Sequence, residues 1–289
     1  MNSLIRNRLF HILIAGVAVL LIGCQGLLIF VAVPHDYVLI YDWIFYAINY
    51  VIIFCFLFIR ISNQAYHWLQ WLVCLILFVA NTTFFYYIGD VNLVVSKSPD
   101  NEHELILKES KKMKNETVRL KRRAGVFGKK VATLAGSAHY KAVEAGTYNI
   151  DWVSGDIAVV TYDATGEGRI EQSIFSMRRS KYVHYRYVAP SLTGKWLERD
   201  NEENYFIYDR GEIVYAKDGE LFYYQDTADT EQHGIFSITV RGDGEKPSFS
   251  VVLNSNCTFE DNDLVNEDCT ITILPASLER TMGQEYFRE

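Results

Sequence analysis

The first 90 residues consist largely of three long apolar runs that are separated by short polar segments. The runs cover residues 9–33, 38–59 and 67–88, and each contains 22 to 25 residues. A helix rises 1.5 Å per residue and the hydrocarbon core of a bilayer is about 30 Å thick, so about 20 residues are enough to cross it. The pattern therefore predicts three transmembrane helices within residues 1–90.

After residue 90 the pattern changes to short stretches in which apolar and polar residues alternate, separated by Gly, Asn and Asp. Alternation with a period of two is typical of strands that have one buried face. Pro275 is followed by Ser277, a candidate N-cap of a short final helix. The expected strands cover residues 92–96, 103–108, 117–123, 148–153, 157–162, 170–177, 181–187, 204–208, 212–216, 220–225, 235–241, 249–253 and 270–274.

These patterns predict a fold class that combines membrane α-helices with an all-β part. Three transmembrane helices are followed by an antiparallel β-sandwich or by two small β-barrel modules. The segment from Pro190 to Gly194 is the best internal boundary between two modules. The expected domains are a helical anchor at 1–90, a basic β module at 91–190 and an acidic β module at 191–289.

The charge distribution supports this division. The chain has 28 basic and 35 acidic residues and a net charge of -7, which argues against a general nucleic-acid binder. Residues 91–190 carry 17 basic and 11 acidic residues, a net of +6, whereas residues 191–289 carry 8 and 21, a net of -13. Such a difference between neighbouring segments indicates two modules that dock electrostatically or face different partners.

The basic residues beside the apolar runs predict the orientation in the cell membrane. Arg6 and Arg8 precede the first run and Arg60 lies in the second loop, while the first loop has neither Lys nor Arg. Positive residues favour the cytoplasmic side. We therefore expect a multi-pass protein with a cytoplasmic N-terminus and an extracytoplasmic segment at 91–289.

A lipidated N-terminus is an alternative with the same sidedness. The segment from Leu21 to Cys24 resembles a bacterial lipobox, and lipidation of Cys24 would also place residues 91–289 outside. The apolar run continues for several residues beyond Cys24, where a mature lipoprotein normally becomes polar. This continuation favours a membrane span.

Few polar residues interrupt the apolar runs. Asn49 and Asn81 are expected to bond a neighbouring helix or a partner protein. Asp42, near a helix end, is the only carboxylate in the runs. Pumps and channels keep charges or polar rings at mid-membrane, so a transport pathway made by this chain alone is not favoured.

Two of the five cysteines, Cys257 and Cys269, lie outside the apolar runs and stand twelve residues apart. They flank the inner ends of two expected strands, so a disulfide would clip a hairpin. Closing such a loop contributes about 3 kcal/mol in the chain-entropy model, and the bond requires an oxidising compartment. Two free buried thiols are the alternative.

Between these cysteines runs an acidic segment with Asp261, Asp263 and Asp268 among its carboxylates. Hard oxygen ligands suit Ca²⁺, but the spacing lacks the glycine and the terminal glutamate of an EF-hand loop. A solvated acidic loop is therefore favoured over an ion site. We expect no metal and no cofactor.

A basic run between Lys108 and Lys130 contains ten Lys or Arg residues. If residues 117–123 form a strand, Arg119, Lys121 and Arg123 share one face, and Lys129 and Lys130 follow close by, so these five are the candidate residues for binding an anionic surface. Three interpretations are open: contact with anionic lipid headgroups or a cell-wall polymer, docking onto the acidic module, or a merely solvated strand face.

Aromatic residues are dense in the acidic module. Exposed rings would suit a carbohydrate or protein surface, whereas buried rings form a core, and a core is favoured. The set consists of Tyr205, Phe206, Tyr208, Tyr215, Phe222, Tyr223 and Tyr224, together with Tyr182, Tyr185 and Tyr187, which alternate on an expected strand just before the module.

Motifs for catalysis are absent from the sequence, which contains no nucleophile elbow, zinc-protease or phosphate-loop signature. A non-enzymatic role is therefore favoured, either binding of an envelope component or that of an accessory subunit with a membrane protein partner. Two alternatives are an envelope enzyme, for which His139, His184 and His233 are the residues to test, and a sensor that signals through a membrane partner.

One segment, Thr193-Gly194-Lys195-Trp196, is similar to the Gly-x-Trp opening of lipocalin-like barrels. As a whole, the chain resembles uncharacterised membrane proteins of Gram-positive bacteria that have an N-terminal helical anchor and an extracytoplasmic β domain. The resemblance implies a β-barrel near Gly194 and an envelope location, and it implies no particular activity.

Overall fold

The computed structural model describes residues 2–59, 63–113, 116–136, 140–178, 185–260, 264–279 and 282–289, with only the backbone of residues 2–8. It forms two compact units, one made of residues 1–95 and 105–134 and the other of residues 96–104 and 135–289. This division differs from the expected boundaries at residues 90 and 190. The reasons are that strands beyond residue 104 pair with a strand before the second helix, and that strands on both sides of residue 190 share one core.

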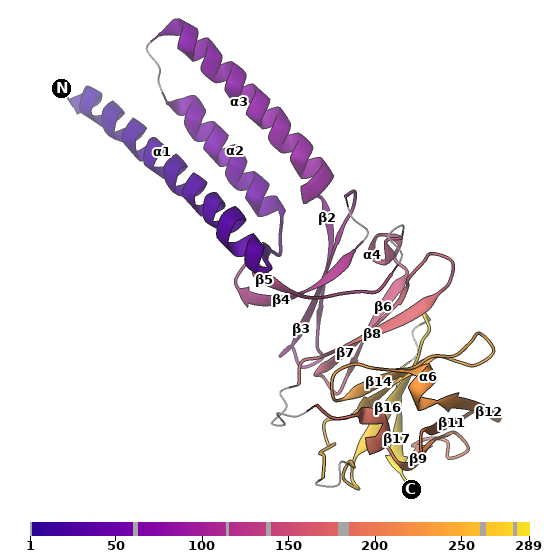
Figure 1. Cartoon of the computed structure of the whole chain (residues 1–289). Helices are drawn as coiled ribbons and strands as arrows, with labels where there is room; N and C mark the ends of the chain where they lie inside the picture. The colour runs from indigo at the N-terminus through magenta and orange to yellow at the C-terminus, as the bar shows by residue number, and fades with distance from the viewer. Residues whose placement is uncertain are drawn as a thin grey trace. The chain divides into compact units, whose positions relative to one another are not determined.

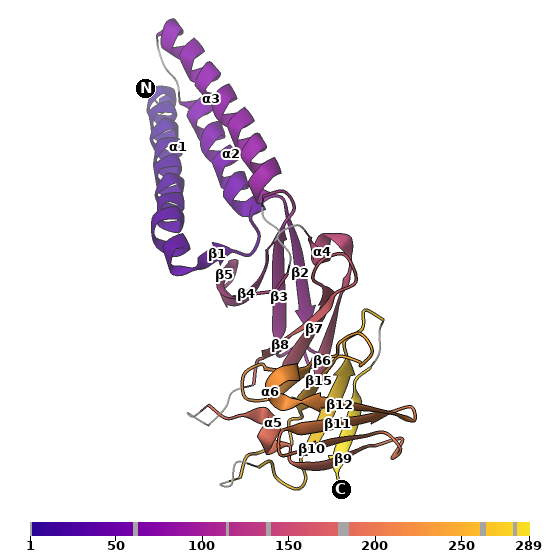
Figure 2. The same cartoon turned by 45° about the vertical axis from the view of Figure 1, so that its right-hand side comes forward.

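The first unit begins with three helices that lie side by side, with the second between the other two (Figures 1 and 2). The first helix extends through a π-helical and a 3-10 segment, and the third ends in another π-helical segment. The elements are α1 (Asn2–Leu27), η1 (Leu28–Ala32), η2 (Val33–His35), α2 (Trp43–Phe58), α3 (Gln64–Phe84) and η3 (Phe85–Gly89).

Two of these helices, rather than the expected three, are long and apolar enough to cross a membrane. The stretches Leu9–His35 and Gln64–Gly89 have 27 and 26 residues, whereas α2 has 16, about 24 Å of helix. The prediction of a helix from residue 38 is wrong because Tyr37–Leu39 form strand β1. The N–H of Ile40 also donates to the carbonyl of Val126, at 2.8 Å, so this segment belongs to a sheet.

Side-chain amides join α2 to α3. Asn49 donates from Nδ2 to Oδ1 of Asn81 at 2.8 Å, which confirms the predicted bond between neighbouring helices. Gln70 Nε2 donates to the carbonyls of Phe56 and Ile59 at 2.5 and 2.8 Å. The N–H of Ile59 also donates to the Phe56 carbonyl, at 3.2 Å, so Gln70 adds a second donor to that carbonyl and supplies a donor to the carbonyl of Ile59.

A five-stranded antiparallel sheet completes the first unit, in the order β1-β5-β4-β3-β2. Its strands are β1 (Tyr37–Leu39), β2 (Val91–Lys97), β3 (Glu104–Ser110), β4 (Thr117–Ala124) and β5 (Phe127–Thr133). A small core of Ile40, Ile106 and Leu120 is fully buried against it. Gly128 permits this packing, because a Cβ there would lie only 3.1 Å from Ile40 Cγ1.

Strand β5 is not among the strands expected from the sequence. A short turn precedes it. Gly125 adopts a φ of +50°, and the chain reverses between Ala124 and Phe127, which face each other in the ladder. Lys129 and Lys130 consequently lie within a strand.

The second unit contains a three-stranded and a nine-stranded antiparallel sheet. The first has the order β6-β7-β8. The second has the order β12-β11-β10-β9-β17-β16-β15-β14-β13 and curls into a nearly closed barrel (Figure 2). The bounds are α4 (Ala142–Ala145), β6 (Tyr148–Val153), β7 (Ile157–Asp163), β8 (Ile170–Ser176), α5 (Val188–Ser191), β9 (Gly194–Glu198), β10 (Tyr205–Asp209), β11 (Glu212–Lys217), β12 (Glu220–Gln225), α6 (Asp226–Asp229), β13 (Thr230–Gln232), β14 (Ser237–Val240), β15 (Phe249–Leu253), β16 (Thr270–Pro275) and β17 (Gln284–Arg288).

Aromatic rings fill the core of this unit, as the sequence predicted for most of them. Phe249 contacts the rings of Phe206, Tyr215 and Tyr224, with centroids 4.4 to 6.4 Å apart. Tyr223, by contrast, is exposed. Ile157 and Val159 of the three-stranded sheet belong to the same core, so the two sheets pack face to face.

Two expectations for single segments differ from the structure. The tail after Pro275 forms no helix in its described part, because β17 inserts between β9 and β16 and pairs with both. Of the expected strand at 181–187, residues 181–184 lie outside the described residues and residues 185–187 are not a strand. The position of β17 between β9 and β16 depends on pairing with strands far away in the chain, so no local sequence pattern indicates it.

Cys257 and Cys269 meet as the sequence predicted. Their sulfur atoms lie 2.10 Å apart, which is disulfide bonding distance, and their Cα atoms are 4.3 Å apart. Both side chains are buried. The bond closes the loop that connects β15 to β16.

The barrel encloses one charged network centred on Glu198. The carboxylate oxygen Oε2 accepts hydrogen bonds from Lys217 at 3.0 Å, Asn204 at 2.9 Å and Tyr286 at 3.1 Å. Burial alone would raise the pKa of Glu198, but these donors and the Lys217 charge hold the pKa below its ordinary value of 4.5. The charged form is therefore the one that the fold stabilises.

We expect this network to make the second unit sensitive to acid. Because the pKa of Glu198 is lowered by folding, its stabilisation is present above about pH 4.5 and is lost as the pH falls through the folded-state value. Glu198→Gln should lower stability at neutral pH and flatten the loss below pH 4.5. Tryptophan fluorescence during urea unfolding at several pH values measures this, because Trp196 is fully buried in the core of the second unit. Glu203→Gln, at an exposed site, is the control, and equal pH profiles for wild type and Glu198→Gln would contradict the prediction.

Candidate functional site

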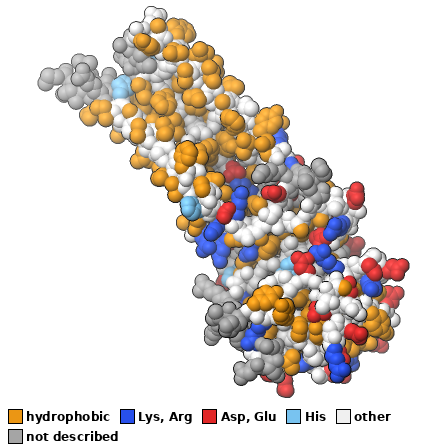
Figure 3. Space-filling model, viewed as in Figure 1, with side chains coloured by type: hydrophobic (Ala, Val, Ile, Leu, Met, Phe, Trp, Pro, Cys, Tyr) orange, Lys and Arg blue, Asp and Glu red, His pale blue; other side chains and the backbone are white. Residues whose placement is uncertain are grey.

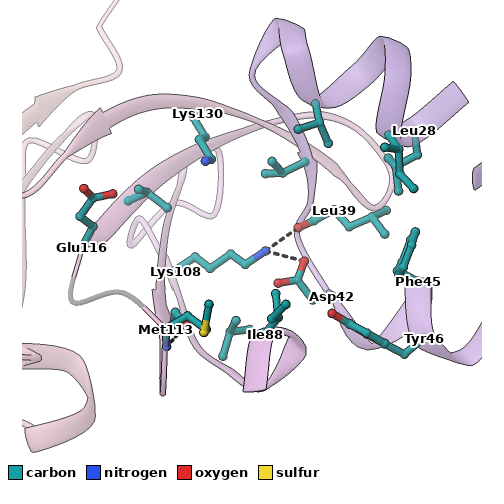
Figure 4. A pocket seen from close by; sticks show the side chains of 16 residues that line it. Leu28, Leu39, Asp42, Phe45, Tyr46, Ile88, Lys108, Met113, Glu116 and Lys130 are labelled. Carbon is teal, nitrogen blue, oxygen red and sulfur yellow. Dashed lines mark hydrogen bonds and ion pairs between the residues drawn. The ribbon is translucent and has the colours of Figure 1, made fainter. Parts of the chain in front are cut away.

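A pocket of about 430 Å³ opens in the first unit where the helices meet the five-stranded sheet (Figure 4). Helix ends, β1 and the strands β2 to β5 all contribute to it. The lining residues are Leu28, Ile29, Val33, Val38, Leu39, Asp42, Phe45, Tyr46, Ile88, Val91, Lys108, Ser110, Met113, Glu116, Val118 and Lys130. Its size is in the range of small-molecule and cofactor sites.

An ion pair crosses the pocket between strand β3 and the residue before α2. Lys108 Nζ lies 2.6 Å from Asp42 Oδ1 and donates to the carbonyl of Leu39 at 2.9 Å (Figure 4). The two charged side chains are only 12% and 25% exposed. Burial raises the pKa of Asp42 and lowers that of Lys108, while their mutual attraction opposes both shifts.

The remaining walls have two chemical characters. One side is apolar, with Leu28, Ile29 and Val33 from the first helical stretch and Phe45 from α2. The opposite side carries the charged groups of β3 and β5, and Figure 4 shows Lys130 extending from the ribbon above Lys108. A molecule with an apolar part and a charged part fits such walls.

The turn between β3 and β4 brings further basic side chains to the end of α3. Lys111 Nζ lies 2.8 Å from Asp90 Oδ1. Lys112 Nζ lies over the Tyr86 ring, 2.6 Å from its centroid, a cation–π contact. Met113 beside them is 60% exposed. Lysines, tyrosines and an exposed apolar side chain therefore share one edge of the sheet.

The five candidate residues for binding an anionic surface lie in different environments. They are Arg119, Lys121, Arg123, Lys129 and Lys130. Lys121 and Arg123 are exposed on β4, whereas Arg119 on the same face is half-buried, and burial lowers its pKa. Lys129 is half-buried, with Nζ 5.7 Å from the Tyr37 ring centroid. Only Lys130 of this set lines the pocket.

Basic side chains dominate the sheet as a whole. Residues 105–134 contain ten Lys or Arg and two acidic residues, a net charge of +8. In Figure 3 blue side chains gather directly below the orange, apolar surface of the helices. A cationic belt thus follows the edge of the apolar surface.

The structure does not assemble the other two candidate sites, the acidic segment between Cys257 and Cys269 and the three histidines, within its described residues. Asp261 and Asp263 lie outside the described residues, and Asp268 is exposed. Within the described ranges, no group of three His, Cys, Asp or Glu side chains is placed to hold a metal ion. His139 and His184 also lie outside the described part, and His233 is half-buried, with a pKa lowered by burial.

The sequence reasoning missed the pairing of Lys108 with Asp42. One signal existed, since Asp42 is the only carboxylate in the second apolar run, and a charge in such a run needs a partner. The partner lies 66 residues away in the chain. Only the folded structure identifies it.

Comparison of the chain with protein-family models, with curated proteins and with solved structures finds no match.

We expect the ion pair to stabilise the first unit. Lys108→Met or Asp42→Leu alone should lower the unfolding free energy by about 2 kcal/mol, since each leaves a largely buried charge without its partner. The double variant should recover most of this loss. Thermal unfolding of the full chain in one detergent measures it, with Lys121→Met on the exposed face as the control. Additive losses in the double variant would contradict the prediction.

Proposed function

We propose that this protein is anchored in the cell membrane by its helices and has a non-enzymatic binding role at the membrane surface. The N-terminus lies in the cytoplasm and the β units lie outside. The basic sheet contacts anionic lipid headgroups. An accessory role beside a membrane protein partner is compatible with the same placement.

The observation that carries this proposal is the junction of an apolar surface with a cationic one. The stretches Leu9–His35 and Gln64–Gly89 are 6% and 17% buried over their most apolar windows. Side chains such as Phe30 and Trp68 are 79% and 70% exposed. Apolar surface of this extent requires a lipid or protein environment.

The short second helix is compatible with this placement. α2 packs against both α1 and α3, and both of these helices end on the side where the sheet begins. After α3 the chain therefore enters the sheet on the same side of the membrane as the end of α1. This holds whether or not α2 spans the whole hydrocarbon layer. The basic belt then lies at headgroup level, where each Lys or Arg gains up to about 1 kcal/mol from an anionic surface.

The pairing of Cys257 with Cys269 supports the external placement independently. Disulfides persist in oxidising compartments and are rare in the cytosol. The positive residues Arg6, Arg8 and Arg60, all on the proposed cytoplasmic side, agree with it.

We predict the labelling pattern of single cysteines by a membrane-impermeant maleimide. In a chain with Cys24, Cys55 and Cys74 replaced by Ala, Lys121→Cys should be labelled in intact cells without reductant. Ser3→Cys should be labelled only after permeabilisation. Cys257 and Cys269 should react in intact cells only after reduction, because the disulfide protects both thiols.

The reverse pattern, with Ser3→Cys labelled in intact cells, would overturn the orientation. Release of the chain from membranes by alkaline carbonate would overturn the anchor itself. The labelling and the carbonate extraction are both carried out on the full chain.

A further inference from the structure

We infer that the pocket between the helices and the five-stranded sheet holds one acyl chain of an anionic phospholipid, with the lipid phosphate at Lys130. The inference rests on the proposed membrane anchoring and specifies its ligand.

The apolar wall matches a hydrocarbon chain. Ile29, on η1, is 46% exposed and Ile88, on η3, is 46% exposed, although both line the pocket. Val33 adds a further exposed side chain to the same wall. Where a ligand covers such side chains, each Å² of apolar surface removed from water contributes about 25 cal/mol to the free energy of binding.

The charged wall selects the headgroup. Lys108 is already engaged by Asp42 and by the Leu39 carbonyl, so its charge is compensated. Lys130 is exposed, and no carboxylate of the described residues lies within ion-pair distance of its ammonium group. It is the cation that remains for a phosphate.

Two carboxylates line the pocket: Asp42, which is paired with Lys108, and Glu116, which opposes an anion. Glu116 is exposed, so water screens its charge. The surrounding sheet, residues 105–134, carries a net charge of +8 that includes Glu116. The potential around the pocket therefore favours an anionic over a zwitterionic phospholipid.

Backbone pairing fixes the position of Lys130. Its N–H donates to the carbonyl of Asp36 at 2.9 Å, and its Cα faces Leu120 in the β4–β5 ladder. Asp36 directly follows η2, the end of the first helical stretch. The same contact thus ties the cation to the helix end that supplies the apolar wall.

The test is native mass spectrometry of the full chain released from nanodiscs of phosphatidylglycerol and phosphatidylcholine in equal amounts. The expected result is one retained phosphatidylglycerol per chain. Lys130→Gln should weaken retention about fivefold, the effect of one lysine at an anionic surface. Arg210→Gln, which removes an exposed positive charge of the second unit, should leave retention unchanged.

A second pair of variants tests the apolar wall. Ile29→Trp should fill the pocket and abolish retention. Val31→Trp, on the same η1 segment and 53% exposed but outside the lining, should not. Both sites are exposed, so neither substitution disturbs a core.

Equal retention of the two lipids, no retained lipid, or loss of retention in both tryptophan variants would overturn the inference. These results are distinguishable from failure of the proposed function. A chain that resists carbonate extraction but retains no phosphatidylglycerol is anchored without a lipid site, whereas a chain that carbonate releases lacks the anchor.

Discussion

The contact between Lys108 and Asp42 is the constraint on which the first unit depends. A carboxylate at the start of a helix and an ammonium group on a strand are both largely removed from water, and the two charged atoms lie 2.6 Å apart. Removal of either group leaves a charge in a poorly solvated place. The start of α2 is therefore fixed to β3, and the pairing of β1 with β5 fixes the same segment from the other side.

This constraint explains why the second apolar run does not form one long helix. Residues 37–40 have the apolar character of a membrane span, but their backbone groups bond to β5 and to Val126. A strand at this point shortens the helix and leaves a space between the helix ends and the sheet. The pocket that we propose as a lipid site is a consequence of that shortening.

Different interactions stabilise the second unit. Its core includes aromatic rings from several strands, and the carboxylate of Glu198 is satisfied by three donors. Its loop between β15 and β16 is clipped by Cys257 and Cys269. We propose no chemistry for this unit, whose described residues include no group of three His, Cys, Asp or Glu side chains placed to hold a metal ion.

The sequence by itself determined the class of the protein: apolar helices first, antiparallel strands afterwards, and Cys257 beside Cys269. It also indicated that Asn49 and Asn81 bond a neighbouring helix or a partner protein, and the structure identified each as the partner of the other. These features depend on local periodicity or on residue types with few possible partners. Only the tertiary structure decided that residues 37–39 are a strand, that β17 lies between β9 and β16, and that Lys108 meets Asp42. Each of these depends on pairing between segments far apart in the chain, and the free energy of such pairing outweighs the local preference that a sequence pattern records.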